Sequence, residues 1–351
     1  MLDESTLTRI LEALPRLSIA VVGDLFLDKY LDLDSRLTET SVETGLDAYQ
    51  VAGVRCYPGA GGTVLNNLKA LGVGNLHAVS VIGPDGEGFE LLRALRERNV
   101  DVEGVVVRSD RMTPTYTKPM LSQSEGPARE LNRLDIKNRV AAAADQDQQV
   151  IARLDALAPR VDALIIADQV TERNQGVITD AVREHLGILA ERHPRVVFFA
   201  DSRSHIGLFR NVLAKPNFSE LVAAVGAGVS AASGSAGAAT HLSDVQAAAQ
   251  RLSKRTGRAV YATVGPDGIL YVDRDSACHV PGVPVSGPID IVGAGDSTTA
   301  GIVSALCAGA TPTQAARLGC LVASITIRQL GVTGTASPEQ VRTRFRESVP
   351  H

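Results

Sequence analysis

A glycine-rich segment that ends in an acidic residue is the strongest chemical feature of the sequence. The tripeptide Gly293-Ala294-Gly295 stands directly before Asp296, at the start of an apolar stretch that is expected to be helical. Small residues leave the backbone N–H groups of a helix start uncovered, and these groups attract anions together with the helix dipole. A carboxylate beside such a site can accept the proton of an alcohol while the N–H groups stabilise a transferring phosphoryl group. The segment therefore predicts phosphoryl transfer to a hydroxyl group, with Asp296 as the general base.

The residues around this segment exclude two common nucleotide-binding motifs. Neither Lys-Ser nor Lys-Thr follows the glycines, so the segment is not a P-loop. No predicted strand leads into a Gly-x-Gly-x-x-Gly motif with a later acidic residue, which disfavours a dinucleotide-dependent oxidoreductase. An ordinary glycine-rich helix start, at which Asp296 interacts with the dipole, remains open beside the anion site.

Two further polar clusters have residue types that bind ligands. Glycines within 59–62 precede Thr63 at a predicted helix start, and they would let a ligand approach the backbone closely. Asn217 and Glu220 carry oxygen atoms that suit Mg²⁺, often through water. Their spacing equally matches an N-cap residue with its capping-box partner, and both interpretations can hold together.

Short apolar runs alternate with stretches of helical periodicity along most of the chain. This alternation predicts an α/β fold in which a mostly parallel sheet is covered by helices on both faces. Asp24, Asp168 and Asp201 end predicted strands, where such sheets bind ligands, although each could equally cap the following helix. The expected strands are 19–24, 78–83, 163–168, 196–201 and 260–265, and the expected helices are 63–71, 87–98, 147–157, 175–191 and 243–254.

Two segments interrupt this alternation. Residues from about 29 to 58 and from 102 to 134 have little helical period and contain β-like runs such as Val105–Val107 and Thr115–Thr117. We expect both to form a small sheet beside the core, which serves as a lid or as a dimer contact. Residues 223–240 are almost entirely Ala, Gly, Ser and Val, which predicts a flexible loop.

The composition is that of an ordinary globular protein. Its 351 residues are 44% hydrophobic and 21% charged, with a net charge of −4 and no basic block, so nucleic-acid binding is not expected. No apolar run predicts a membrane span, and the acidic N-terminus is unlike a signal peptide. The four Cys residues follow no metal-ligand spacing, which indicates reduced thiols and a cytoplasmic protein.

Several segments, in matching order along the chain, resemble signatures of the ribokinase-like (PfkB) carbohydrate kinases. Asp290–Asp296 resembles the C-terminal signature Asp-Thr-x-Gly-Ala-Gly-Asp, with Ile291 in place of the Thr, and Pro58–Gly72 resembles the N-terminal glycine signature. The other matches are Gly23–Tyr30, where Asp28 follows the first strand as the sugar-binding aspartate, the Asn-x-x-Glu motif within Lys215–Glu220, and the nucleotide-side turn Thr263–Gly268. Arg133-Leu134-Asp135 and the start Gly-Asp-x-x-Leu-Asp are similar to the branch that phosphorylates heptose 7-phosphate.

The resemblance implies one three-layer αβα domain over residues 1–351, with a small β lid that also forms a homodimer contact. It implies transfer of the γ-phosphoryl group of ATP, with Mg²⁺, to a hydroxyl group of a sugar or sugar phosphate. Whether a monovalent cation is a further cofactor is left open. The implied catalytic residues are Gly293, Ala294, Gly295 and Asp296. Those for the nucleotide are Asn217, Ser219, Glu220, Thr263, Gly265 and Gly268, with Asn217 and Glu220 at the metal. Those for the acceptor are Asp28, Gly59, Gly61, Gly62, Thr63, Asn67, Arg133 and Asp168.

Three departures from the family pattern bear on the ligands. Thr63 stands where the family has an Asn, and a hydroxyl group has less reach than an amide. After Asp168, the stretch Gln169–Gly176 is longer than its counterpart in the heptose-kinase branch and lacks a Tyr. The loop 223–240 looks inserted near the nucleotide side. We therefore expect an altered substrate rim on an active enzyme, because Asp296 and its glycines are intact.

A kinase for a heptose phosphate is the first expectation from these observations, and a kinase for another hexose or pentose is the second. The alternative from another class is a catalytically silent regulator that binds a sugar or nucleotide on the same fold. Such a regulator would keep Asp28 and the glycines but could lose the base.

Overall fold

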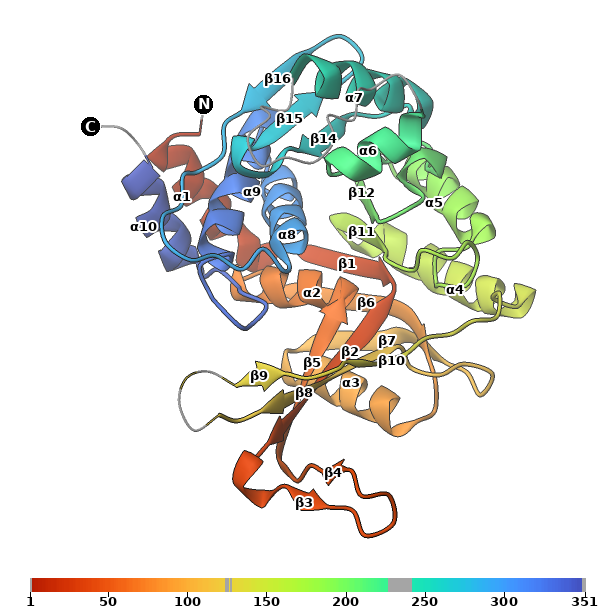
Figure 1. The fold of residues 1–351 in the computed structure, drawn as a ribbon. Coiled ribbons are helices and arrows are strands. Elements are labelled where there is room, and N and C mark those ends of the chain that lie inside the picture. Colours follow the sequence, from red (N-terminus) through yellow and green to blue (C-terminus); the bar gives the residue numbers. More distant parts are fainter. Residues whose placement is uncertain (1, 124–125, 127, 227–241, 349–351) are drawn as a thin grey trace.

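A nine-stranded sheet forms the centre of the computed structural model, which describes residues 2–123, 126, 128–226 and 242–348 (Figure 1). Its strands are parallel to one another except for the last two along the chain, which add in antiparallel fashion at one edge. In spatial order they are β16 (Ala277–Val280), β15 (Ile269–Val272), β14 (Val260–Thr263), β13 (Leu213–Ala214), β12 (Val197–Ser202), β11 (Ala163–Asp168), β1 (Ser18–Gly23), β6 (Asn75–Ile82) and β7 (Val100–Val107).

Helices cover both faces of this sheet. Along β1, Ile19 and Val21 belong to one apolar core while Ala20 and Val22 belong to the other, because alternate side chains of a strand point to opposite faces. The expected three-layer αβα architecture is confirmed. One core includes α1 (Glu4–Ala13), α2 (Gly61–Ala70), α3 (Gly86–Glu97), α8 (Ala294–Cys307), α9 (Pro312–Thr326) and α10 (Pro338–Ser348), and the other includes α4 (Ala144–Leu157), α5 (Asp180–Arg192), α6 (Phe218–Val225) and α7 (Leu242–Thr256).

A second, smaller sheet extends beyond the core as a lid (Figure 1). Only Asp24 separates β1 from the first lid strand, so the chain passes directly from the core into the lid. The lid contains β10 (Leu134–Ile136), β8 (Thr115–Leu121), β2 (Leu25–Leu33) and β5 (Val51–Ala60) in spatial order, β9 (Arg129–Glu130) beside β8, and the separate hairpin of β3 (Glu39–Thr40) and β4 (Asp47–Ala48). Five short 3₁₀ helices complete the described elements: η1 (Leu14–Arg16), η2 (Ser35–Leu37), η3 (Ala158–Arg160), η4 (Ile206–Leu208) and η5 (Gly265–Asp267).

The structure corrects the predicted lid in two respects. The run Val105–Val107 was expected in the lid, but it pairs in parallel with β6 and closes the edge of the central sheet. Asp28 was expected just beyond the end of a strand, but it lies within β2, between Tyr57 of β5 and Tyr116 of β8. A β-rich pattern identifies strands, but it does not say which of two sheets they join.

The helix expected at 175–191 begins only at Asp180. Thr179 is its N-cap and accepts a hydrogen bond from the Val182 N–H group. The residues before Thr179 are not helical because the Val177 N–H group donates to the buried Asp24 carboxylate instead. Of the predicted loop 223–240, residues 223–225 end α6, and residues 227–240 lie outside the described residues.

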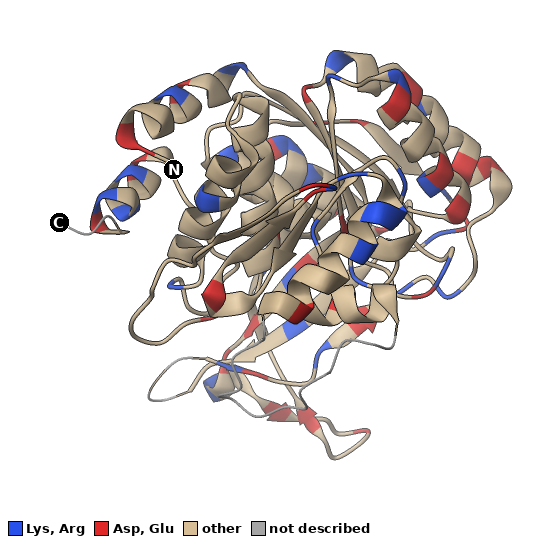
Figure 2. Ribbon diagram, turned by 90° about the horizontal axis from the view of Figure 1, so that it is seen from above, with Lys and Arg blue, Asp and Glu red and all other residues tan. Residues whose placement is uncertain are grey.

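The distribution of charge gives no single-signed face in the view of Figure 2, where Lys and Arg are interspersed with Asp and Glu over the outer helices. Among the helices that the structure describes, none is long and apolar enough to cross a membrane.

Candidate active site

The N-termini of α8 and α2 meet beyond the carboxyl end of the central strands. Gly293 is the N-cap of α8 with a φ of 79°, a left-handed conformation that favours glycine. A Cβ atom at Gly293 would lie 2.7 Å from Cγ2 of Thr333 and 3.4 Å from Cγ2 of Thr63. Thr63, in the first turn of α2, therefore faces the N-terminus of α8, whose own first turn carries Asp296.

The start of α2 is held by close backbone packing. A Cβ atom at Gly62 would lie 2.4 Å from Cβ of Pro58, so this position requires glycine. One turn later, the buried Asn67 donates from Nδ2 to the carbonyl oxygen of Thr63 at 3.0 Å. Its Oδ1 atom is buried without a hydrogen-bond partner in the described part of the chain. Asn67 thus orients the turn that carries Thr63.

The lid contributes a second carboxylate. Asp28 Oδ1 lies 3.3 Å from Lys118 Nζ, and a Cβ atom at Gly59 would lie 2.7 Å from Asp28 Oδ2. Gly59 therefore leaves room for the Asp28 side chain. Arg133 forms an ion pair with Asp135 at 2.7 Å, and its guanidinium carbon lies 4.1 Å from the centre of the Tyr116 ring. Arg133 is thus engaged within the lid.

A buried ion pair lies beneath the first turn of α8. Lys215 Nζ is 3.0 Å from Oδ2 of Asp201, and Thr299 of α8 donates to the same oxygen at 3.1 Å. A Cβ atom at Gly295 would lie 3.5 Å from Lys215 Nζ. The ammonium group therefore adds positive charge next to the helix N-terminus, where both would act on the same anion.

The charges in this cluster change one another's protonation. Burial and the nearby Asp201 carboxylate raise the pKa of Asp296 to about 7, although Lys215 and Arg203 lower it. Burial by itself would lower the pKa of Lys215, but the carboxylates of Asp201, Glu220 and Asp296 raise it. Lys215 therefore remains charged, and Asp296 can take up or release a proton near neutral pH.

Asn217 and Glu220 form the capping box of α6. Asn217 Oδ1 accepts from the N–H group of Glu220 at 2.9 Å and from the Ser219 hydroxyl at 2.7 Å. Glu220 Oε2 in return accepts from the Asn217 N–H group at 2.8 Å. Burial raises the pKa of Glu220, while its hydrogen bond from Asn217 and the charge of Lys215 oppose this rise.

The predicted nucleotide-side turn adjoins this helix start. Thr263 donates its N–H group to the carbonyl oxygen of Pro216 at 2.9 Å and forms a parallel bridge with Asn217. Gly265 and Gly268, with φ of 61° and 100°, form the turn between β14 and β15. A Cβ atom at Gly268 would lie 2.2 Å from the carbonyl oxygen of Val280, so the turn requires glycine there.

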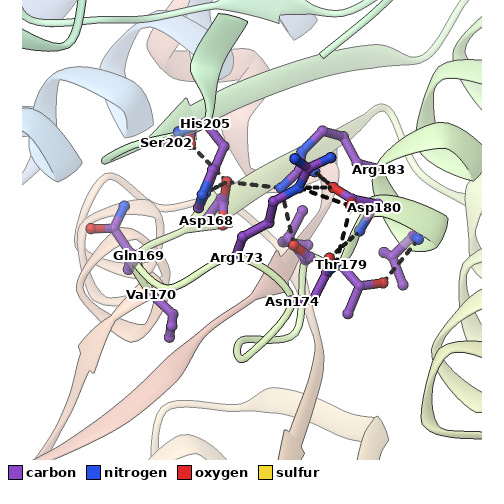
Figure 3. A network of polar contacts seen from close by, with 12 residues as sticks. Asp168, Gln169, Val170, Arg173, Asn174, Thr179, Asp180, Arg183, Ser202 and His205 are labelled. Carbon is purple, nitrogen blue, oxygen red and sulfur yellow. Dashed lines mark hydrogen bonds and ion pairs between the residues drawn. The ribbon is translucent and has the colours of Figure 1, made fainter. Parts of the chain in front are cut away.

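Asp168 lies inside a buried polar network (Figure 3). Its Oδ2 atom accepts from the Ser202 hydroxyl at 2.7 Å and lies 3.6 Å from Arg183 Nη2. Asp180 forms ion pairs with Arg183, at 2.7 Å, and with Arg173. The network fixes the strand ends and the loop after β11, and the acceptor contact expected for Asp168 stays a prediction.

Sequence reasoning gave no role to Lys215, Lys118 or Tyr116. Lys215 stands within a segment that was matched to the family pattern, directly before Pro216, but a single lysine carries no distinctive signal. The sequence pointed to Asp201 only through its position at a predicted strand end, and that position fits a helix cap equally well. The importance of Asp201 and Lys215 follows from the contact of β12 and α8, which the sequence pattern does not specify.

Comparison with known proteins agrees with this geometry. Residues 17–340 match the family model described as pfkB family carbohydrate kinase. The chain belongs to this family. The family is described as one of carbohydrate kinases, which makes a sugar kinase the class of enzyme that membership implies. The chain is 29% identical over 325 residues to "Bifunctional protein HldE" of Citrifermentans bemidjiense, covering 92% of this chain and 62% of that protein. The HldE protein of Geobacter sulfurreducens is 26% identical over 323 residues, with 92% and 61% covered, so the chain spans about three fifths of these relatives.

Solved structures of more distant proteins share the fold. Phosphofructokinase-2 from Escherichia coli, in complex with potassium, superposes with a TM-score of 0.70 at 19% identity and covers 94% of this chain and 99% of its own. Arabidopsis thaliana ribokinase, complexed with ribose and ATP, gives a TM-score of 0.65 at 16% identity, with 94% and 99% covered. The expected ribokinase-like fold is confirmed.

The buried pair of Lys215 and Asp201 gives a prediction for stability. Lys215→Met removes one partner and leaves the Asp201 carboxylate buried without its cation, so the free energy of unfolding should fall by about 3 kcal/mol. Lys254→Met, on the exposed side of α7, is the matched control and should change it by less than about 0.5 kcal/mol. Urea unfolding measures both, and equal effects of the two substitutions would contradict the importance of the pair.

Proposed function

We propose that the chain transfers the γ-phosphoryl group of ATP to a hydroxyl group of a sugar or sugar phosphate, with Asp296 as the general base. The observation that carries this proposal is the position of Asp296 in the first turn of α8, beside the buried Lys215. A heptose 7-phosphate is the first candidate acceptor, because Arg133-Leu134-Asp135 and the Asp24–Asp28 segment resemble the branch that uses it.

The residues have distinct parts in this reaction. Asp28, Gly62, Thr63 and Asn67 hold the acceptor so that its hydroxyl group faces Asp296. Asp296 accepts the hydroxyl proton while the acceptor oxygen bonds to the γ-phosphorus, and the bond from this phosphorus to the β–γ bridging oxygen breaks to release ADP. The N–H groups of Gly293–Gly295 and the ammonium group of Lys215 stabilise the charge on the transferring group.

The nucleotide lies on the side of α6 and the β14–β15 turn in this proposal. Ser219, Thr263, Gly265 and Gly268 form its surroundings. The lid sheet closes over the acceptor and excludes water, which otherwise competes as an acceptor.

The residues at the start of α6 fit Mg²⁺ in different ways. Glu220 uses one carboxylate oxygen in the capping box, and the other is left for a metal-bound water. Asn217 Oδ1 already accepts two hydrogen bonds, so Asn217 positions Glu220 rather than binding the ion directly. In the described part of the chain, no group of three or more His, Cys, Asp or Glu residues could hold a metal ion. Mg²⁺ would supply charge neutralisation on the ATP phosphates, with Glu220 as the protein's contribution.

The lid also supports a homodimer. Its outer parts expose large apolar side chains that a second copy of the lid could cover. They are Leu37, Val42, Leu46, Tyr49, Val51 and Val54, which are 40% to 101% exposed.

Asp296→Asn tests the role of the base. The substitution removes the proton acceptor but keeps the shape of the anion site, so turnover should fall by a factor of about 10² to 10⁴ with ATP binding nearly intact. ADP release from ATP and Mg²⁺ is measured against a panel of sugars and sugar phosphates that includes heptose 7-phosphates. Near-normal turnover of the variant would show that Asp296 is not the base. If the wild-type protein binds ATP but releases no ADP with any member of the panel, the catalytically silent regulator is favoured instead.

The raised pKa of Asp296 predicts the pH dependence of the reaction. Only the carboxylate form accepts a proton, and this form is lost as the pH falls through about 7. The logarithm of kcat/KM should therefore rise by about one per pH unit below this value and level off above it. The unfolding temperature, measured over the same pH range, controls for acid unfolding. A profile that is flat through neutral pH in the stable protein would contradict the assignment.

A further inference from the structure

Three polar side chains meet at the amino end of the central sheet, the edge opposite to the candidate active site. Ser18 is the first residue of β1, His77 the third of β6 and Asp101 the second of β7, and these strands are neighbours in the sheet. His77 and Asp101 are direct register partners, and His77 pairs with Ala20, two residues beyond Ser18. Because side chains alternate along a strand, Ser18 and Ala20 point to the same face, where the three polar groups come together.

These side chains form a continuous series of hydrogen bonds. Ser18 Oγ lies 3.2 Å from His77 Nε2, and His77 Nδ1 lies 2.9 Å from Asp101 Oδ2. A carboxylate only accepts hydrogen bonds, so in the neutral imidazole Nδ1 carries the proton and Nε2 accepts from the Ser18 hydroxyl. A hydroxyl nucleophile, an imidazole base and a carboxylate that orients the base are the three parts of a serine hydrolase triad.

The carboxylate that orients His77 is itself held in place. The register between β6 and β7 shifts just after His77 and Asp101, and there Asp101 Oδ1 accepts from the N–H group of Glu103 at 2.9 Å. Burial by itself would raise the pKa of Asp101, but the hydrogen bonds from Glu103 and His77 lower it. Asp101 therefore stays ionised at neutral pH, and each of its oxygens has a fixed partner.

The backbone of Ser18 is fixed by the segment that leads into β11. Its N–H group donates to Asp162 Oδ2 at 2.8 Å, and its carbonyl oxygen accepts from the Asp162 N–H group at 2.7 Å. Among the residues that the structure describes, His77 is the hydrogen-bond partner of the Ser18 hydroxyl. The hydroxyl group thus makes the one contact that a nucleophile needs, while the backbone holds its position.

The three residues lie partly open to solvent, among charges that select a substrate. The side chain of His77 is 16% exposed and that of Asp101 40%, and Ser18 is partly buried. Arg160, two residues before Asp162, is exposed, and its charge also lowers the pKa of Asp101. Its guanidinium group makes no ion pair or hydrogen bond with another described residue, so its donors are available to an oxyanion. The carboxylates of Asp101 and Asp162 would repel a substrate with its own negative charge, so an uncharged ester fits this site.

We propose that Ser18, His77 and Asp101 form a second catalytic site, which hydrolyses small uncharged carboxylic esters. His77 Nε2 takes the Ser18 proton as Oγ bonds to the ester carbonyl carbon, and Arg160 donates to the carbonyl oxygen as it becomes negative. The carbonyl then re-forms, the bond to the alcohol oxygen breaks, and His77 returns the proton to the departing alcohol. Water attacks the acyl group on Ser18 in the same way, which releases the carboxylic acid and restores the hydroxyl group.

Hydrolysis of p-nitrophenyl acetate tests the site. The wild-type protein should release p-nitrophenol faster than Ser18→Ala and His77→Gln by a factor of about ten or more, since each substitution removes a part of the triad. His185→Gln is the matched control and should keep the wild-type rate, because His185 forms a similar pair with Asp155, at 2.9 Å, away from Ser18. The unfolding temperature of each variant shows that it is folded. Equal rates for the wild-type protein and Ser18→Ala would overturn the proposal.

Covalent labelling identifies the nucleophile directly. Diisopropyl fluorophosphate, whose phosphorus bonds to an activated serine oxygen with loss of fluoride, should modify Ser18 in the wild-type protein, as measured by mass spectrometry of its peptides. His77→Gln should lose most of this label and His185→Gln should keep it, because only His77 activates the hydroxyl group. A label at another residue, or none at all, would contradict the triad. Neither measurement contains ATP, so both are independent of the proposed kinase reaction.

Discussion

The ion pair between Lys215 and Asp201 connects the central sheet to the first turn of α8. Both residues are buried, at 3.0 Å from each other, and Thr299 of α8 donates to the same Asp201 oxygen. The single ammonium group faces three carboxylates, those of Asp201, Glu220 and Asp296, and all of them raise its pKa. Because the positive charge does not fully offset the enclosure of Asp296, that carboxylate keeps a pKa of about 7. In the proposed reaction, the charge balance of this cluster makes a base available at neutral pH.

The connection between the central sheet and the lid sheet is a single residue. Asp24 lies between the last residue of β1 and the first residue of β2, and its buried carboxylate binds the loop after β11. Four residues later, Asp28 stands on the lid beside Lys118. Two acidic residues close together in the chain therefore have different contacts, since the first holds the loop after β11 and the second is the residue proposed to bind the acceptor.

Much of the fold and part of the candidate site follow from the sequence. Apolar runs identified β1, β6, β11, β12 and β14 because strands buried on both faces need continuous apolar residues, and the spacing of small residues before Asp296 identified the start of α8. The prediction that Val105–Val107 belongs to the lid sheet was wrong, since a β-like run is compatible with either sheet. The helix start at 175 was also wrong, because the Asp24 carboxylate binds the backbone from a distant part of the chain. The role of Lys215 depends on burial by residues remote in the sequence, and a single basic residue carries no pattern from which burial can be read.

In the proposed reaction, a phosphoryl group passes from ATP to an acceptor hydroxyl held at the start of α8. Phosphorus NMR of the wild-type protein with ATP, Mg²⁺ and sedoheptulose 7-phosphate observes this transfer directly. A new phosphate-ester resonance on the sugar should grow in step with the resonances of ADP. Release of inorganic phosphate without a new ester, or unchanged ATP with every acceptor tested, would contradict it.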